Sequence, residues 1–186
     1  ELFGKVLEYT NDDASSLSWQ QATDMVVDGR AAFNVMGDWA AGYMSTTKKL
    51  APGSGFGWAA APGTGGEFMF LADSFGLPKG APNRDNVVAW LALLGSQEGS
   101  DAFNPLKGSI SARTDSDLSK YNDYAKSASA DFGKDRIVGS LAHGVTANEG
   151  FMNDFASVME MFLKSGNAEA AGKAAQQIAM KNGIGK

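Results

Sequence analysis

Four residues that lie far apart in the sequence have side chains suited to holding a polyhydroxylated ring: Trp39, Asp73, Lys107 and His143. An indole offers a flat apolar face to the C–H patch of such a ring. Carboxylate, ammonium and imidazole groups form charge-assisted hydrogen bonds, and these can hold neighbouring hydroxyl groups. The four residues also fall at the ends of expected elements or in loops, where ligands commonly bind. Their types and positions are typical of a sugar-binding site.

Three of these residues also have a structural alternative. Trp39 can be a core aromatic residue, because large rings are usually mostly buried. Asp73 interrupts a long apolar run, so its carboxylate must be hydrogen-bonded, neutralised or open to a polar cleft, and it can cap a local turn with Ser74. His143 can be a structural histidine whose ring nitrogens are satisfied by neighbours. The sequence leaves these alternatives open.

Catalysis has little support in the sequence. There are no cysteines and His143 is the only histidine, which excludes a thiolate nucleophile and a multi-histidine metal site. The G-x-S-x-G motif is absent, and no local motif places a serine beside His143. The spacing Gly53-x-Gly55-x-Gly57 does not match the G-x-G-x-x-G dinucleotide fingerprint. The sequence therefore predicts no catalytic residue, no metal site and no cofactor.

Two other function classes remain as alternatives. In a carbohydrate-active enzyme, Asp73 would form a carboxylate pair with Glu67 or Asp38, and turnover of nitrophenyl glycosides would reveal it. In a structural interaction module, Trp39 and His143 would be core residues, and sugars would leave the tryptophan fluorescence unchanged.

Composition limits the partners. The 186 residues are 44% apolar, which is enough to bury a core. The net charge of -5 argues against a nucleic-acid binder, because neutralising phosphates requires a basic face. No apolar segment approaches the roughly 20 residues that span a bilayer. We therefore expect no nucleic-acid partner.

The element that positions Trp39 is expected to be a strand followed by a helix. Residues 31–36 form a short apolar run that predicts a buried strand, and Gly37 breaks it. Asp38 is expected to cap a helix that begins at Trp39. In open α/β sheets, ligands bind where loops leave the carboxyl ends of strands. This arrangement would place Trp39 at such an edge.

Other elements are indicated by caps and breaks. Ser18 and Gln21 form a capping box before a helix that Gly29 can end. A second strand is expected at residues 57–62. Asn83 begins an apolar helix that ends at Gly95, and Ser96 opens a shorter helix that is expected to stop before Pro105. Residues 137–142 are an extended candidate, and two helices follow, over residues 149–165 and 167–181.

The chain resembles the C-terminal half of an extracellular solute-binding protein of an ABC sugar importer (family 1), and is most similar to the glucose/galactose/mannose-binding branch. The stretches that carry the resemblance are Gly29–Trp39, Leu71–Phe75, Pro105–Ile110 and Arg136–Gly144. They occur in family order and at family-like spacing. The pattern G-[KR]-A-A-x-x-V-M-G-D-W is moderately specific, and its combination with S-L-x-H-G is strongly so.

This resemblance implies an α/β fold of the periplasmic-binding-protein-like type II, with two lobes and a hinge that the chain crosses more than once. Residues 1–72 and 130–186 would belong to the C-terminal lobe, and residues 73–129 would cross the hinge and return to the N-terminal lobe. Trp39 would stack on a pyranose, and Asp73, Lys107 and His143 would bind its hydroxyl groups. The implied partners are the N-terminal half of the protein, a monosaccharide and a membrane permease. The implied location is periplasmic or extracellular, as a cell-surface lipoprotein if the organism is Gram-positive.

Overall fold

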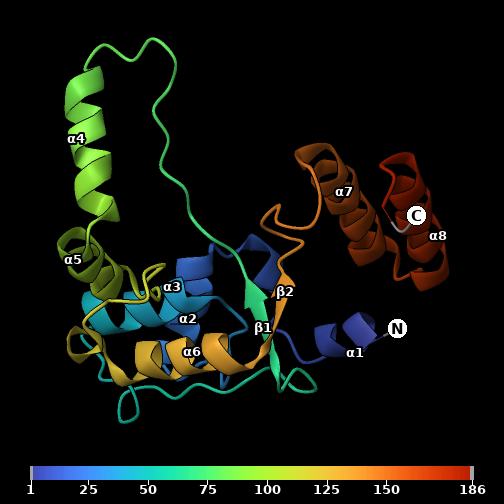
Figure 1. Cartoon of the computed structure of the whole chain (residues 1–186). Helices are drawn as coiled ribbons and strands as arrows, with labels where there is room; N and C mark the ends of the chain where they lie inside the picture. Colours follow the sequence, from blue (N-terminus) through green and yellow to red (C-terminus); the bar gives the residue numbers. More distant parts are fainter. Residues whose placement is uncertain (1, 185–186) are drawn as a thin grey trace. The chain divides into compact units, whose positions relative to one another are not determined.

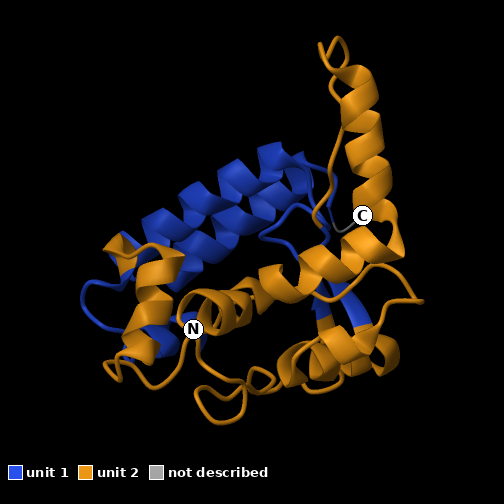
Figure 2. Cartoon of the chain, turned by 90° about the vertical axis from the view of Figure 1, so that its left-hand side faces the viewer, with its two compact units in different colours: residues 1–14, 69–72, 137–186 blue, residues 15–68, 73–136 orange. Residues whose placement is uncertain are grey.

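The computed structural model describes residues 2–184, which form two compact units. Of the described residues, unit 1 comprises 2–14, 69–72 and 137–184, and unit 2 comprises 15–68 and 73–136. Figure 2 shows the two units in blue and orange. The architecture is mixed and helix-rich with one small sheet. No helix in the described part of the chain is long and apolar enough to cross a lipid bilayer.

Unit 1 is built around two consecutive helices, α7 (Glu149–Ser165) and α8 (Ala168–Lys181), which pack on each other. Its buried cluster consists of Val158, Phe162 and Ala171. The short helix α1 (Leu2–Leu7) joins this cluster, and the ring centroid of Phe3 lies 6.1 Å from that of Phe162.

Capping residues determine where α7 and α8 begin and where α7 ends. Asn148 caps α7 by accepting the Phe151 N–H at 2.8 Å, and Gly166 ends it in the left-handed conformation. Asn167 then caps α8 by accepting the Ala170 N–H at 3.0 Å. These local signals confirm the two helices that the sequence predicts.

Unit 2 contains most of the remaining elements, shown in Figure 1. They are α2 (Trp19–Val27), α3 (Asp38–Gly42), the π-helix η2 (Tyr43–Thr47), α4 (Arg84–Gly95), α5 (Gln97–Lys107), the 3-10 helix η3 (Leu118–Lys120) and α6 (Asp123–Lys134). A further 3-10 turn, η1 (Ala14–Ser16), lies where the chain passes from unit 1 to unit 2. The predicted capping box of α2 is present, with Ser18 and Gln21 bonded reciprocally.

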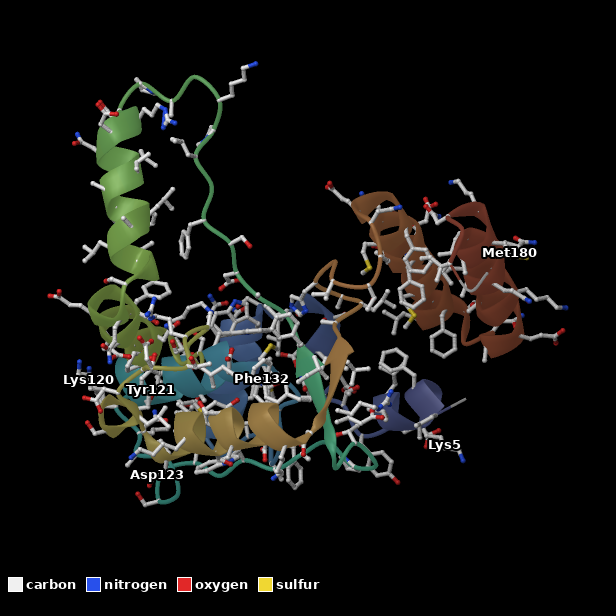
Figure 3. All side chains as sticks on the ribbon, viewed as in Figure 1. Lys5, Lys120, Tyr121, Asp123, Phe132 and Met180 are labelled. Carbon is white, nitrogen blue, oxygen red and sulfur yellow. The ribbon has the colours of Figure 1, made fainter. Side chains whose placement is uncertain are left out.

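The small sheet pairs β1 (Glu67–Phe70) with β2 (Arg136–Gly139). The Arg136 N–H donates to the Gly66 carbonyl at 3.0 Å, and the Ser140 N–H donates to the Phe70 carbonyl at 2.8 Å. The bonded positions advance in the same direction along both strands, so the pair is parallel. Within unit 2, Phe68 of β1 packs edge-on against Phe132 of α6, with ring centroids 5.2 Å apart. Phe132 is labelled in Figure 3.

Several sequence predictions of elements are wrong. Residues 31–36 and 57–62 are irregular, because a strand requires a partner and no described segment pairs with either one. The helix α5 does not stop before Pro105 but runs to Lys107. Pro105 lies in the last turn, where its missing N–H removes a single bond, and Gly108 in the left-handed conformation ends the helix.

Candidate functional site

The site in unit 2 depends on a close main-chain contact between α3 and the end of α5. A Cβ atom added at Gly42 would lie 2.1 Å from the Lys107 carbonyl oxygen. One added at Gly108 would lie 2.5 Å from the Gly42 Cα and 2.7 Å from the Asp38 carbonyl oxygen. Only glycine permits this approach at both positions, and Gly108 also has a φ of 93°. The contact brings Lys107 beside the helix that carries Trp39.

Lys107 forms an ion pair with Asp73, with 2.8 Å between Nζ and Oδ2. The Lys107 side chain is 27% exposed and the Asp73 side chain 52% exposed, so the pair remains open to solvent on its carboxylate side. Asp73 follows β1, and Lys107 is the last residue of α5, where a cation is favourable at the helix C-terminus. The contact joins two of the four predicted site residues.

Asp38 is a third charged group in this cluster. Burial raises the pKa of its carboxyl, and the charge of Asp73 adds to this effect, whereas Lys107 and the Trp39 N–H oppose it. The folded protein therefore holds this proton more tightly than the unfolded chain does. Asp38 favours folding below its ordinary pKa of 3.8, and this contribution is lost as the pH rises through the folded-state pKa. Lys107 thus pairs with Asp73 and also interacts electrostatically with Asp38.

Trp39 is the second residue of α3 and is half-buried. Its six-membered ring folds back over Gly37, where an added Cβ would lie 2.2 Å from Cζ3 of the indole. Gly37, not Asp38, is the N-cap of α3, which corrects the predicted cap by one residue. Asp38 instead forms the first helical residue, so its carboxyl lies at the start of the helix beside the Trp39 N–H.

Tyr124 of α6 lies within electrostatic range of the same cluster. Burial raises its pKa to about 12, and the charges of Asp38 and Asp131 add to the shift. The ring of Trp58 packs edge-on against Tyr124 with centroids 5.6 Å apart, and the Trp58 indole N–H donates to the Ser127 hydroxyl at 3.3 Å. Sequence reasoning missed Tyr124, because its position 51 residues after Asp73 gives no local signal.

His143 belongs to unit 1, in the loop that follows β2. Its Nδ1 lies 2.8 Å from the Ser140 hydroxyl, and Ser140 is 2% exposed whereas His143 is exposed. No local sequence motif predicts this contact, but the structure places Ser140 beside His143. The short loop turns at Gly144, whose φ is 71°, and the Val145 N–H returns to the Ser140 carbonyl at 3.1 Å. Ser140 thus helps to orient the imidazole ring.

The structure thus joins Asp73 and Lys107 in one contact and places Trp39 on the helix packed against Lys107, all within unit 2. It places His143 in unit 1. Two partners of Asp73 were considered for a catalytic carboxylate pair. Asp38 interacts electrostatically with Asp73, whereas Glu67 forms an ion pair with Arg136 instead. Among residues 2–184, no group of three or more His, Cys, Asp or Glu side chains could hold a metal ion.

An apolar hollow of about 200 Å³ lies in unit 1 and contains none of the four predicted residues. Aromatic and small residues of α1, α7 and α8 line it, including Phe3, Phe155, Phe162 and Gly172. Its lining has no charged group, so it offers no charge-assisted hydrogen bond to a hydroxyl group. The charged cluster of unit 2, rather than this hollow, carries the chemistry.

Comparison with known proteins identifies similar sequences. The profile of the bacterial extracellular solute-binding protein family matches residues 1–101. An uncharacterized ABC transporter extracellular-binding protein of Pyrococcus horikoshii is 33% identical over 173 residues, which is 92% of this chain and 38% of that protein. A probable sugar-binding periplasmic protein of Mesorhizobium japonicum is 34% identical over 164 residues, 86% of this chain and 39% of that protein.

The xylose/arabinose-binding protein XacG of Haloferax volcanii is 32% identical over 138 residues, 74% of this chain and 30% of that protein. The chain therefore spans less than two-fifths of the length of these relatives. All three relatives are named as binding proteins, and the helix-rich architecture with a small sheet is consistent with a periplasmic-binding-protein-like fold. On this evidence the chain belongs to the bacterial extracellular solute-binding proteins of family 1.

Proposed function

We propose that this chain is part of a non-catalytic binding protein that holds a monosaccharide, glucose or galactose/mannose, and delivers it to the permease of an ABC importer. The observation that carries the proposal is the Asp73–Lys107 pair at 2.8 Å, in which Lys107 ends the helix that packs against the helix of Trp39. A partly exposed ion pair and an indole on the neighbouring helix are the charged partners and the apolar face that a pyranose requires. The names of the relatives support a sugar ligand.

Each predicted residue has a role in this proposal. Trp39 stacks on the ring, and Asp73 accepts hydrogen bonds from hydroxyl groups to which Lys107 donates. His143, whose ring is oriented by Ser140, forms a further hydrogen bond with a hydroxyl group. The fold is of type II, with two lobes that close on the sugar by a hinge motion; residues 1–72 and 130–186 belong mostly to one lobe, and residues 73–129 cross the hinge and return to the other.

The proposed partners are the N-terminal portion of the same protein and the membrane permease, and the proposed location is periplasmic or extracellular. The relatives are longer than this chain by more than a factor of two, which supports a further portion that completes the sugar cleft. Their names place them outside the cytoplasm.

Calorimetric titration tests the proposal. D-glucose, D-galactose, D-mannose and D-xylose are titrated in turn into the chain, with sucrose as the control sugar. We expect saturable heat with a hexose and none with sucrose. Heat with xylose alone would change the assigned sugar, since one relative is a xylose/arabinose-binding protein. The absence of heat with all four monosaccharides would contradict sugar binding by this chain.

Variants then test the site. Asp73→Ala is expected to weaken hexose binding by about 2–3 kcal/mol, as for other charge-assisted hydrogen bonds. Asp28→Ala is the matched control, because Asp28 also forms an ion pair, with Arg30, and its side chain is 56% exposed. The control should bind the sugar as the wild type does. A loss smaller than ~0.5 kcal/mol in folded Asp73→Ala would show that the site is assigned to the wrong residues.

A further inference from the structure

The side chain of Asn104 holds the last turn of α5, the turn that ends at Lys107. The Asn104 amide group donates to the Ser100 carbonyl at 3.0 Å and to the Ser100 hydroxyl at 2.9 Å. Its oxygen Oδ1 accepts the Ser109 hydroxyl at 2.9 Å. A single side chain thus joins the body of α5 to the chain that leaves the helix after Lys107.

The orientation of this amide follows from its partners. A main-chain carbonyl only accepts hydrogen bonds, so the Asn104 atom that faces the Ser100 carbonyl is the nitrogen, and Oδ1 faces Ser109. The Asn104 main chain contributes as well, because its carbonyl accepts the Gly108 N–H at 2.9 Å. Asn104 is helical although it precedes Pro105, a position where the helical conformation is disfavoured. Its hydrogen bonds oppose this preference and keep the last turn closed.

Buried polar contacts attach the following loop to the same helix. The Ser100 hydroxyl, in a residue that is 6% exposed, lies 2.8 Å from the Ser111 hydroxyl. Further along the chain, the Asp117 N–H donates to Oδ2 of Asp101 at 3.1 Å, and Asp101 is 4% exposed. No buried side-chain nitrogen or oxygen among the described residues lacks a hydrogen-bond partner. A fully bonded polar network is rigid, so the end of α5 is fixed relative to the rest of the helix.

The placement of Lys107 depends on this rigidity. Its side chain is a flexible four-carbon stem, so the ammonium group is placed accurately only when the main chain at residue 107 is fixed. The Lys107 carbonyl lies against Gly42 of α3. Asn104 fixes the same turn from within α5. Together these contacts set the point from which Nζ of Lys107 reaches Oδ2 of Asp73 at 2.8 Å.

We propose that Asn104 is a positioning residue that holds the Lys107 ammonium group at Asp73, in the place where it donates to a sugar hydroxyl group. Asn104 acts through Lys107 and does not touch the sugar. The inference rests on the proposed function in taking Lys107 as a donor to the sugar. Loss of the Asn104 amide therefore releases Lys107 and weakens sugar binding, even though every residue that contacts the sugar is retained.

Labelling of lysine side chains tests the positioning in the sugar-free chain. The chain is treated briefly with acetic anhydride, and mass spectrometry gives the acetylation rate of each lysine. An ammonium group in an ion pair must leave its carboxylate before the amine reacts, so a released Lys107 is labelled faster. We expect Asn104→Ala to raise the acetylation rate of Lys107 by at least about 3-fold, toward the rate in Asp73→Ala, where the partner is absent. An unchanged rate at Lys107 overturns the proposal.

Lys48 is the internal control for this measurement. It forms an ion pair with Asp24 at 2.8 Å, and its side chain is 31% exposed, against 27% for that of Lys107. Its acetylation rate should not change in Asn104→Ala. An equal increase at Lys48 and Lys107 would show that unit 2 opens as a whole, and would overturn the proposal.

Asn182→Ala is the control variant. The Asn182 amide donates to a carbonyl four residues earlier, that of Ile178, at 2.8 Å, so this variant loses the same kind of bond as Asn104→Ala does. It should leave the Lys107 rate at the wild-type value. Ser109→Ala removes only the hydroxyl that Oδ1 accepts, and it keeps the proposal testable if Asn104→Ala does not fold. Ser109→Ala should raise the Lys107 rate, and Ser109→Thr, which retains a hydroxyl, should restore it.

Calorimetry then tests the effect on the sugar. Asn104→Ala should bind the hexose about 10-fold more weakly, because a displaced ammonium group loses one charge-assisted hydrogen bond. In the background of Lys107→Met, which removes the ammonium group, Asn104→Ala should cause no further loss. An equal loss in the wild-type and Lys107→Met backgrounds would show that Asn104 does not act through Lys107, and would overturn the proposal. Asn182→Ala should bind the hexose as the wild type does.

The two proposals fail separately. Faster labelling of Lys107 in Asn104→Ala, together with no hexose binding by the wild type, would retain the positioning of Lys107 and contradict the proposed function. Hexose binding by the wild type with unchanged labelling of Lys107 in Asn104→Ala would do the reverse.

Discussion

The contact between Gly42 and Lys107 predicts that a single methyl group at residue 42 will damage the site. An alanine Cβ at this position would lie 2.1 Å from the Lys107 carbonyl oxygen and 2.6 Å from its carbon. Ordinary contacts of a Cβ atom begin at 3.4 Å. The obstacle is main chain, so no side-chain rotation can relieve it, and α3 must move away from the end of α5 by roughly 1 Å.

The free energy of unfolding reports this displacement. Overpacking of a close contact typically costs 1–3 kcal/mol, and we take about 3 kcal/mol because the clash involves main-chain atoms on both sides. Alanine in a helix is favoured over glycine by about 1 kcal/mol, which opposes this cost. The net expectation for Gly42→Ala is a destabilisation of about 2 kcal/mol. Urea unfolding followed by tryptophan fluorescence measures it.

Gly133→Ala is the matched control. Gly133 is also helical, in α6, but an added Cβ would meet no atom within 4 Å. This variant should be stabilised by up to about 1 kcal/mol, because only the helix propensity changes. The reasoning would be refuted if Gly42→Ala were as stable as Gly133→Ala, since the main-chain contact would then be absent in solution.

Three further predictions concern titration and burial. Asp38→Asn should be more stable than the wild type near pH ~7, and this advantage should disappear toward pH ~3, where the wild-type carboxyl is protonated. Urea unfolding across this range measures the difference, and a difference that does not change with pH would contradict the raised pKa of Asp38. In an alkaline absorbance titration, the signal lost in Tyr124→Phe should have its midpoint at about 12, not at the ordinary 10.0. Asp101→Ala should cost about 2–3 kcal/mol, because Asp101 is 4% exposed and accepts the hydroxyl of the buried Tyr121 at 3.4 Å. Asp123→Ala, on an exposed side chain of α6, should change stability by less than ~0.5 kcal/mol in the same unfolding assay.

Local signals in the sequence predicted the helices well. The capping box at Ser18, the cap at Asn148 and the left-handed Gly166 each depend on residues within one turn, so they can be recognised without knowledge of the fold. The strand predicted at residues 31–36 is wrong because local signals do not reveal whether a strand has a partner. A strand forms only when another segment pairs with it, and no described segment does so.

The candidate site was predictable in residue type but not in arrangement. Asp73 stands out because it interrupts an apolar run, but its pairing with Lys107, 34 residues later, depends on where α5 ends. That end was misplaced, because Pro105 was expected to stop the helix. The participation of Asp38 depends on two glycines that let α3 and α5 touch, and the sequence does not indicate which glycines meet.

The division of unit 1 into three separate stretches of chain has a consequence for its synthesis. The helix α1 is made well before α7 and α8, which carry the residues that cover Phe3 and Leu7. At typical translation rates of 5–20 residues per second, α1 waits on the order of ten seconds for these helices. During this interval its apolar side chains are accessible to chaperones and proteases. Synthesis that stops before residue 149 would leave α1 without the surface on which it packs.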